Sequence, residues 1–142
     1  MFKNMESFKK VLIIEDEVAF LKALEGELEL QGVNVITATD GKSGLDKAIK
    51  EHPDLIFLDI ILPVMDGISV LKELRKDLWG NKAIVVLLTQ TDDLNRVAEA
   101  MENGVSKYFV KADQSIPDII GQTKIYLSGQ EFPRGKQKGP IV

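Results

Sequence analysis

Short apolar runs alternate with amphipathic stretches five times along this chain, and no other feature limits the possible folds as strongly. The runs have the length of buried strands and cover residues 11–14, 33–38, 55–58, 83–88 and 107–110. Each is followed by residues at helical spacing, as Leu21, Leu24 and Leu28 follow the first run. A strand–helix unit repeated five times predicts an α/β fold, with a parallel sheet, helices on both faces and right-handed connections.

Capping residues and helix breakers indicate where the helices begin and end. The expected cap and breaker residues are Gly32, Asp40, His52, Pro53, Gly67, Asp92 or Asp93, Gly104 and Ser115. The apolar residues at helical spacing are Val18, Leu21, Leu24 and Leu28 in the first helix, Leu45, Ala48 and Ile49 in the second, Ile68, Leu71 and Leu74 in the third, and Val97, Ala98 and Met101 in the fourth. The last helix is expected to open on a capping box at residues 115–118 and to end near residue 129.

Composition is typical of one domain with its own core, because 44% of the 142 residues are apolar. The formal net charge of -4 gives no sign of direct nucleic-acid binding. The apolar runs are too short to cross a bilayer, and the first residues lack the apolar core of a secretory signal. With no cysteine, disulfide and thiolate chemistry are excluded, and a cytoplasmic location is expected.

The last thirteen residues differ in character from the rest of the chain. Residues 130–142 hold one acidic residue, Glu131, against Arg134, Lys136 and Lys138, and prolines and glycines interrupt any periodicity. We therefore expect a domain over residues 1–129 and a flexible basic tail or linker over residues 130–142.

Polar residues follow four of the five predicted strands, at the point where each apolar run stops. They are Glu15 and Asp16 after the first strand, Asp59 after the third, Thr89 after the fourth and Lys111 after the fifth. In a parallel sheet these positions share one edge, which is where open α/β sheets bind ligands. Carboxylates gathered there repel each other unless a cation joins them, and oxygen ligands suit a hard divalent ion such as Mg²⁺.

Five elements in this order resemble one known family. They are Glu15 with Asp16, Asp59, Pro63 with Asp66 and Gly67, Thr89, and Lys111. Residues 8–128 resemble the receiver domain of two-component response regulators. Residues 57–67 are the part of the chain in which this resemblance is most specific. The resemblance implies a flavodoxin-like (βα)5 fold, a doubly wound parallel sheet with strand order 2-1-3-4-5.

The resemblance also implies a phosphoacceptor function. Asp59 would take a phosphoryl group from a histidine kinase, a histidine phosphotransfer protein or a small phosphodonor. The resulting acyl phosphate is labile enough to reset the signal. A domain of this kind assists its own phosphorylation and dephosphorylation and is not a turnover enzyme.

Metal and charge roles follow from the same resemblance. Asp16, Asp59 and the backbone carbonyl of Ile61 would ligate Mg²⁺, and Glu15 would do so directly or through water. Thr89 would donate its hydroxyl to a phosphoryl oxygen, and Lys111 would supply a fixed positive charge. Phosphoryl transfer depends mostly on such positioning and charge stabilisation.

Switching in this family couples the pocket to a protein-binding surface. Thr89 would be drawn toward the phosphoryl group and free space for Tyr108, the aromatic residue on the fifth strand. The fourth helix, fifth strand and last helix would then present a changed surface to a downstream protein target.

Several residues depart from the usual pattern of receivers. Glu15 stands where Asp is usual and is expected to retain metal binding. Ala112 stands where receivers have a Pro with a cis peptide, so the 111–112 bond is either cis or trans with a changed loop. Gln90 is expected to restrict access of water or phosphodonors to the pocket, and the apolar Ile61 cannot position an attacking water. Both residues are therefore expected to lengthen the phosphoryl lifetime.

Other interpretations of the sequence remain open. The chain could be a scaffold that no longer switches by phosphate, or the receiver part of a longer protein with an output domain, with residues 130–142 as its linker. A phosphohydrolase with an Asp nucleophile would need a second, general-acid Asp where this chain has Ile61, so the sequence disfavours that function. The last helix carries more apolar residues than one buried stripe needs, which indicates either a partner surface or a deep core.

Overall fold

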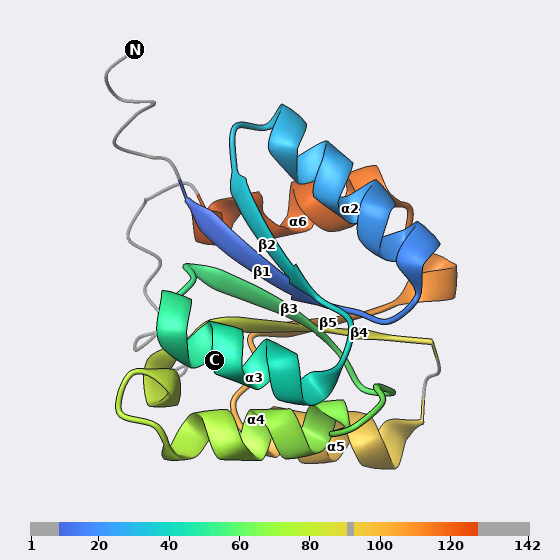
Figure 1. Ribbon diagram of the computed structural model, residues 1–142. Coiled ribbons are helices and arrows are strands. Elements are labelled where there is room, and N and C mark those ends of the chain that lie inside the picture. The colour runs from blue at the N-terminus through green and yellow to red at the C-terminus, as the bar shows by residue number, and fades with distance from the viewer. Residues whose placement is uncertain (1–8, 91–92, 128–142) are drawn as a thin grey trace.

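Five parallel strands form the centre of the molecule, in the order β2-β1-β3-β4-β5 (Figure 1). The computed structural model describes residues 9–90 and 93–127. The strands are β1 (Lys10–Ile14), β2 (Asn34–Ala38), β3 (Leu55–Asp59), β4 (Val85–Thr89) and β5 (Lys107–Val110). The predicted flavodoxin-like topology is therefore confirmed.

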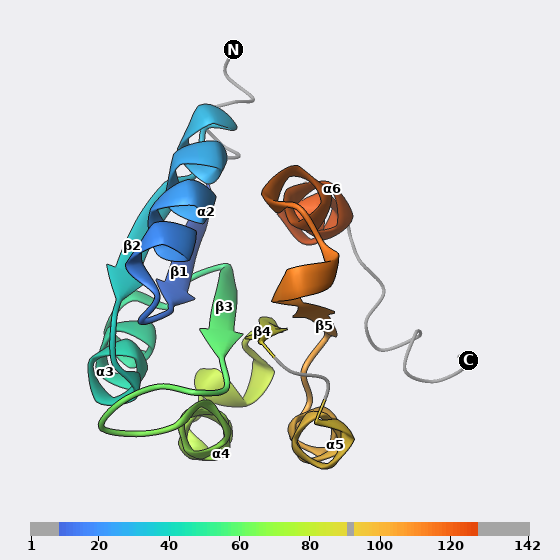
Figure 2. The ribbon, with the colours of Figure 1, turned by 90° about the vertical axis from the view of Figure 1, so that its right-hand side faces the viewer.

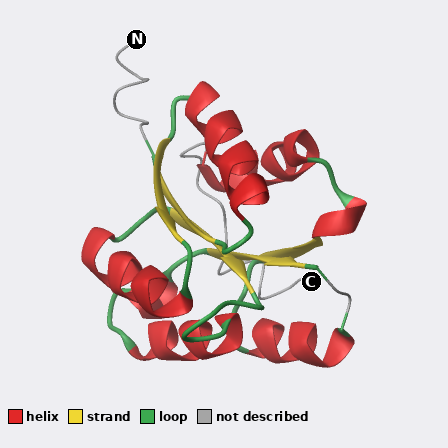
Figure 3. Ribbon diagram, turned by 45° about the vertical axis from the view of Figure 1, so that its right-hand side comes forward, coloured by secondary structure: helices red, strands yellow, loops and turns green. Residues whose placement is uncertain are grey.

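Helices cover both faces of this sheet. The helices are α2 (Val18–Leu30), α3 (Gly41–Glu51), α4 (Gly67–Lys76), α5 (Leu94–Glu102) and α6 (Ile116–Leu127), with short 3-10 turns η1 (Gly80–Lys82) and η2 (Lys111–Asp113). Figure 2 shows α2 and α6 on one face and α3, α4 and α5 on the other, and Figure 3 shows the sheet as a twisted layer between them. Among the described residues, no helix is long and apolar enough to span a membrane.

Each strand contributes side chains to two separate cores. In β1, Leu12 and Ile14 pack in the core beneath α3 and α4, whereas Val11 and Ile13 pack in the core beneath α2 and α6. This alternation is the period-two pattern of a strand that is covered on both faces. All residues of β3 and β4 are buried, while β2 is only partly covered and lies at an edge, as its polar residues indicate.

Side-chain caps fix the start of several helices. The carboxylate of Asp40 accepts a hydrogen bond from the backbone N–H of Ser43 at 2.8 Å, and that of Asp66 accepts one from Ser69 at 3.0 Å. Of the two candidate caps for α5, Asp93 caps the helix, and Asp92 lies outside the described residues. These caps satisfy backbone donors that have no partner inside a helix.

Three helical faces differ from those predicted, and in α3 the difference is Ile49, which is exposed. Val18 lies at the first turn of α2 and is exposed. In α5 the buried residues are Val97 and Ala100, whereas Ala98 and Met101 are exposed. A nine-residue helix presents only a narrow stripe of side chains to the core. A small error in the predicted rotation of the helix about its axis therefore changes which residues are expected to face inward.

The apolar residues of α6 are used mostly in the core. Ile119 and Ile120 are buried, and Ile116, Tyr126 and Leu127 pack against the same cluster. One of the two bonds of the predicted capping box is present, since the backbone N–H of Asp118 donates to Ser115 Oγ at 3.1 Å. The structure therefore favours the deep-core interpretation of this helix over a broad apolar surface.

Candidate functional site

The carboxyl ends of the central strands bring the predicted polar residues to one edge of the sheet. Asp59 ends β3 opposite Leu88, and Thr89 ends β4 opposite Val110. Glu15 follows β1 directly, and its backbone N–H donates to the carbonyl of Ala38 at 3.0 Å. This arrangement results from the parallel register, since every strand stops at the same edge.

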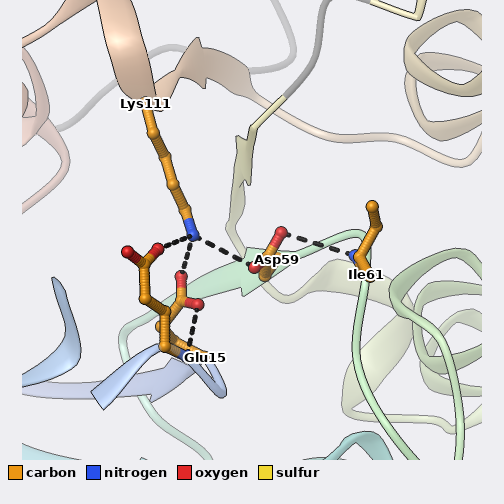
Figure 4. Close-up of polar contacts among 5 residues, drawn as sticks. Glu15, Asp59, Ile61 and Lys111 are labelled. Atoms are coloured by element: carbon orange, nitrogen blue, oxygen red, sulfur yellow. Dashed lines mark hydrogen bonds and ion pairs between the residues drawn. The ribbon is translucent and has the colours of Figure 1, made fainter. Parts of the chain in front are cut away.

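Lys111 joins the acidic residues across this edge (Figure 4). Its ammonium nitrogen lies 2.7 Å from Glu15 Oε1, 3.2 Å from Asp59 Oδ2 and 3.2 Å from Glu17 Oε1. The Lys111 side chain is only 8% exposed, and the ammonium also lies 4.8 Å from the centre of the Phe20 ring. A cation with little access to water is therefore held by three carboxylates and one aromatic face.

Three of the predicted ligands come close enough to share one metal ion. Each of Glu15, Asp16 and Asp59 offers a carboxylate oxygen, and these oxygens all lie within 4.8 Å of one another. Glu15 is fully buried, and its Oε1 has an ion pair with Lys111 but no hydrogen bond of good geometry. An incompletely satisfied buried oxygen in an all-oxygen donor set fits a hard divalent cation.

Burial and neighbouring charge perturb the pKa of Glu15. Loss of solvent raises the pKa of this carboxyl, Lys111 opposes that effect, and the charge of Asp59 raises it further, so that it reaches about 7. The ordinary value for a glutamate is near 4.5. The metal-free pocket thus holds more negative charge than its single lysine can offset.

We expect Glu15→Gln to stabilise the metal-free protein at pH 8. The folded chain binds the Glu15 proton more tightly than the unfolded chain, so wild-type stability falls as the pH rises from about 4.5 to about 7. The variant lacks this loss and should unfold at a higher urea concentration, with a gain in the free energy of unfolding of about 2 kcal/mol at pH 8 that disappears below about pH 4. Urea unfolding in EDTA measures this, and equal stability of the two proteins at pH 8 would contradict it.

The loop between β3 and α4 holds Asp59 in place. The backbone N–H of Ile61 lies 3.4 Å from Asp59 Oδ1, and the N–H of Gly67 donates to the carbonyl of Ile60 at 2.7 Å. Val64 in this loop has φ 71°, a conformation that strains a β-branched residue, and its side chain is 81% exposed. Backbone strain of this kind is characteristic of loops that shape a functional site.

The two predicted switch residues lie in different environments. Thr89 is fully buried at the end of β4. Tyr108 lies on β5 opposite Leu87, and its side chain is 38% exposed. Thr89 is thus close to the pocket, whereas Tyr108 faces outward on the neighbouring strand.

The turn after Lys111 resolves the question raised by Ala112. No peptide bond in the described part of the chain is cis, so the bond between Lys111 and Ala112 is trans. These residues form the 3-10 turn η2, and the ammonium still reaches Asp59. The changed-loop alternative is therefore the one observed.

Glu17 is a member of this site that the sequence reasoning missed. It contacts Lys111 through its carboxylate and donates its backbone N–H to Glu15 Oε2 at 2.9 Å. Its position directly after Asp16, at the start of α2, was the available signal, but an acidic residue at a helix start is common for other reasons.

Comparison with known proteins shows the family to which the chain belongs. A family model for the response regulator receiver domain matches residues 11–120. The chain belongs to this family. The chain is 34% identical over 140 residues to the alkaline phosphatase synthesis transcriptional regulatory protein PhoP of Bacillus subtilis. The aligned region covers 94% of this chain and 58% of PhoP. The chain spans about half the length of the curated relatives it matches.

Two solved structures are similar to the receiver domain over almost their whole length. The phosphorylated cyanobacterial phytochrome response regulator RcpA matches with a TM-score of 0.78 and 25% identity, over 89% of this chain and 99% of that one. The Mn²⁺-bound form of response regulator Rcp1 matches with a TM-score of 0.77 and 25% identity, over 88% of this chain and 99% of that one.

Proposed function

We propose that this receiver domain accepts a phosphoryl group on Asp59 and transmits a signal by changing its protein contacts. The observation that carries the proposal is the contact of 3.2 Å between Lys111 and the nearly buried Asp59 carboxylate, at the end of β3. A buried carboxylate beside a fixed ammonium can act as a nucleophile toward an anionic phosphoryl group, because the ammonium offsets the repulsion between them.

Glu15, Asp16, Asp59 and the carbonyl of Ile61 would hold a Mg²⁺ ion in this site. The three carboxylates already gather within 4.8 Å, and oxygen atoms are the preferred ligands of this ion. Response regulator Rcp1, which has a similar fold, has been solved in a form with bound Mn²⁺. When bound, Mg²⁺ supplies positive charge that lowers the repulsion between the carboxylates and an incoming phosphoryl group.

The transfer step uses groups that the chain itself provides. An oxygen of Asp59 forms a bond to phosphorus while the P–N bond of a phosphohistidine breaks, and the electron pair stays on the imidazole nitrogen, which takes up a proton. Lys111 balances charge on the phosphoryl oxygens, and the Thr89 hydroxyl donates a hydrogen bond to one of them. Water later cleaves the acyl phosphate to inorganic phosphate and the carboxylate, so the domain is an acceptor that resets and not a turnover enzyme.

A histidine kinase or histidine phosphotransfer protein is the proposed donor, and a second protein is the proposed target. The target would bind the surface formed by α5, β5 and α6. Tyr108 lies on this surface and is partly exposed, which leaves it free to turn inward when Thr89 moves toward the phosphoryl group. The change is a local charge event that biases two arrangements of the same elements.

A phosphate-independent scaffold is the second candidate, and Gln90 together with the η2 turn at Ala112 favours it. The family relation also permits a longer protein, in which this receiver controls an output domain. If the domain is a phosphoacceptor, as proposed, its phosphoryl group is long-lived, because the side chain of Ile61 cannot orient an attacking water. An autodephosphorylation half-life of seconds would contradict that part of the proposal.

Uptake of one phosphoryl group should require the acidic cluster and a divalent ion. With acetyl phosphate and Mg²⁺, the intact protein is expected to gain the mass of one phosphoryl group, and EDTA or Asp16→Asn should remove the gain. Asp46→Asn, which neutralises an exposed carboxylate paired with Lys42 on α3, is the matched control and should behave like wild type. Absence of uptake in wild type, despite measured Mg²⁺ binding, would favour the scaffold.

A further inference from the structure

The carboxylate of Glu17 is an additional partner of Lys111. Within the described residues, the Lys111 ammonium is the only one that contacts the acidic cluster. Glu17 Oε1 accepts a hydrogen bond from Lys111 Nζ at 3.2 Å. The residue occupies the N-cap position of α2, yet its side chain makes no capping hydrogen bond there. The carboxylate that could have capped the helix is therefore directed to Lys111 instead.

The three carboxylates that contact Lys111 have different roles. Glu15 is fully buried and belongs to the proposed metal-binding group, and Asp59 is the proposed nucleophile. Glu17 has neither role, and its side chain is 49% exposed, so it lies at the mouth of the pocket. An ammonium has three N–H donors, so a phosphoryl oxygen can bind Lys111 only by replacing one of these carboxylates or by sharing a donor with it.

The charge of Glu17 also acts on anything that approaches the pocket. Glu15, Asp16, Glu17 and Asp59 carry four formal negative charges against the single charge of Lys111. A bound divalent cation would leave the pocket with a formal charge of minus one, and a neutral residue at position 17 would leave it at zero. A small phosphodonor is itself an anion, and like charge at the mouth of a cleft lowers the rate of its approach.

We propose that Glu17 is a specificity-determining residue that disfavours small anionic phosphodonors and anions by occupying Lys111 and by repelling them at the pocket mouth. This inference rests on the proposed phosphoacceptor function. A phosphohistidine on a protein is less affected, because the partner's own surface can offset the charge of Glu17. The residue therefore favours a protein donor over metabolites that carry a phosphoryl group.

The test compares the rate of phosphoryl uptake from acetyl phosphate in wild type, Glu17→Gln and Glu17→Asp. Removal of the charge should raise the rate about tenfold at an ionic strength of about 0.05 M, with a smaller ratio near 1 M, where screening is strong. Glu17→Asp keeps the charge and should stay within about twofold of wild type. Phosphoramidate carries less net negative charge than acetyl phosphate, so the gain from Glu17→Gln should be smaller with it.

Glu29→Gln is the matched control, since it removes the same charge from an exposed position on α2. It should leave the rate unchanged at both salt concentrations. An unchanged or slower rate in Glu17→Gln at low salt would overturn the proposal. So would an equal gain in Glu29→Gln, because the effect would then reflect net charge alone.

A second measurement keeps this inference separate from the proposed function. Beryllofluoride, formed from beryllium chloride and sodium fluoride, is titrated with Mg²⁺ present, and amide NMR shifts of Ile61 and Thr89 follow its binding. Glu17→Gln should bind it about tenfold more tightly than wild type at low salt. If no variant takes up phosphate but this difference is found, the phosphoacceptor function fails and the role of Glu17 in excluding anions stands. Equal affinities would contradict that role directly.

Discussion

Asp59→Asn is expected to abolish phosphoryl uptake from every donor. The amide nitrogen and oxygen of asparagine fit the same space at the end of β3, but the side chain is a poor nucleophile and cannot form a stable acyl phosphate. Intact-mass measurement with acetyl phosphate and Mg²⁺ should show the gain of one phosphoryl group in wild type and none in the variant. The expected loss is complete, because the oxygen that bonds to phosphorus belongs to Asp59. The neighbouring carboxylates of Glu15 and Asp16 are assigned to metal binding.

The fold of Asp59→Asn should be intact, which makes its loss of uptake informative. Replacement of one carboxylate in a crowded acidic cluster relieves repulsion, so the variant should unfold at the same or higher urea concentration as wild type. Uptake by Asp59→Asn at the wild-type level would show that another residue is the acceptor. Asp46→Asn, on the surface of α3, is again the control that keeps uptake.

Gly67→Ala is expected to cause a large loss of stability. A Cβ at this position would lie 2.1 Å from the carbonyl oxygen of Asp59 and 2.8 Å from the Cα of Ile60. These neighbours are backbone atoms of β3 and its loop, so they cannot move aside as a flexible side chain would. We expect a loss of about 3 kcal/mol in urea unfolding, together with weaker Mg²⁺ binding because Asp59 is displaced.

Gly26→Ala is the matched control for that substitution. Gly26 lies inside α2, and apart from the neighbouring backbone of the helix itself no atom would lie within 4 Å of an added Cβ. Alanine should therefore stabilise the helix by about 0.5 to 1 kcal/mol and leave phosphoryl uptake unchanged. If Gly67→Ala were as stable as wild type, the close approach of α4 to the end of β3 would not constrain the site as described.

The strands and the polar edge were predictable because they depend on local sequence. Apolar runs of four to six residues identify strands that are buried on both faces, and the polar residue after each run is then at a known edge. The caps at Asp40 and Ser115 were predictable for a similar reason, because a cap acts within four residues of chain. The same reasoning placed Asp59 and Lys111 at one site, and the structure shows them in contact.

Features that depend on distant parts of the chain were not predictable. Arg75 donates hydrogen bonds to the backbone carbonyls of Gly80, Ala83, Asn103 and Gly104, and it thereby ties the end of α4 to the end of α5. Its burial lowers the pKa of the guanidinium. Nothing in the residues around Arg75 distinguishes it from an ordinary surface arginine, because its partners lie up to 29 residues away.

The contact between Glu17 and Lys111 has the same origin, since 94 residues separate them. The burial of Ala100 in place of the expected Ala98 on α5 also depends on how that helix packs against the sheet. The domain boundary at residue 129 and the basic tail over residues 130–142 lie outside the described residues and stay predictions.

The most direct test of the central claim is to locate the phosphoryl group. The protein is incubated with acetyl phosphate and Mg²⁺, the acyl phosphate is reduced with sodium borohydride, and the digested peptides are sequenced by mass spectrometry. Reduction converts a phosphorylated aspartate to homoserine, which marks the acceptor. We predict homoserine at position 59 alone, and none in a sample treated with EDTA. Homoserine at Asp16 or at another aspartate, with none at position 59, would contradict the assignment of Asp59 as the phosphoacceptor.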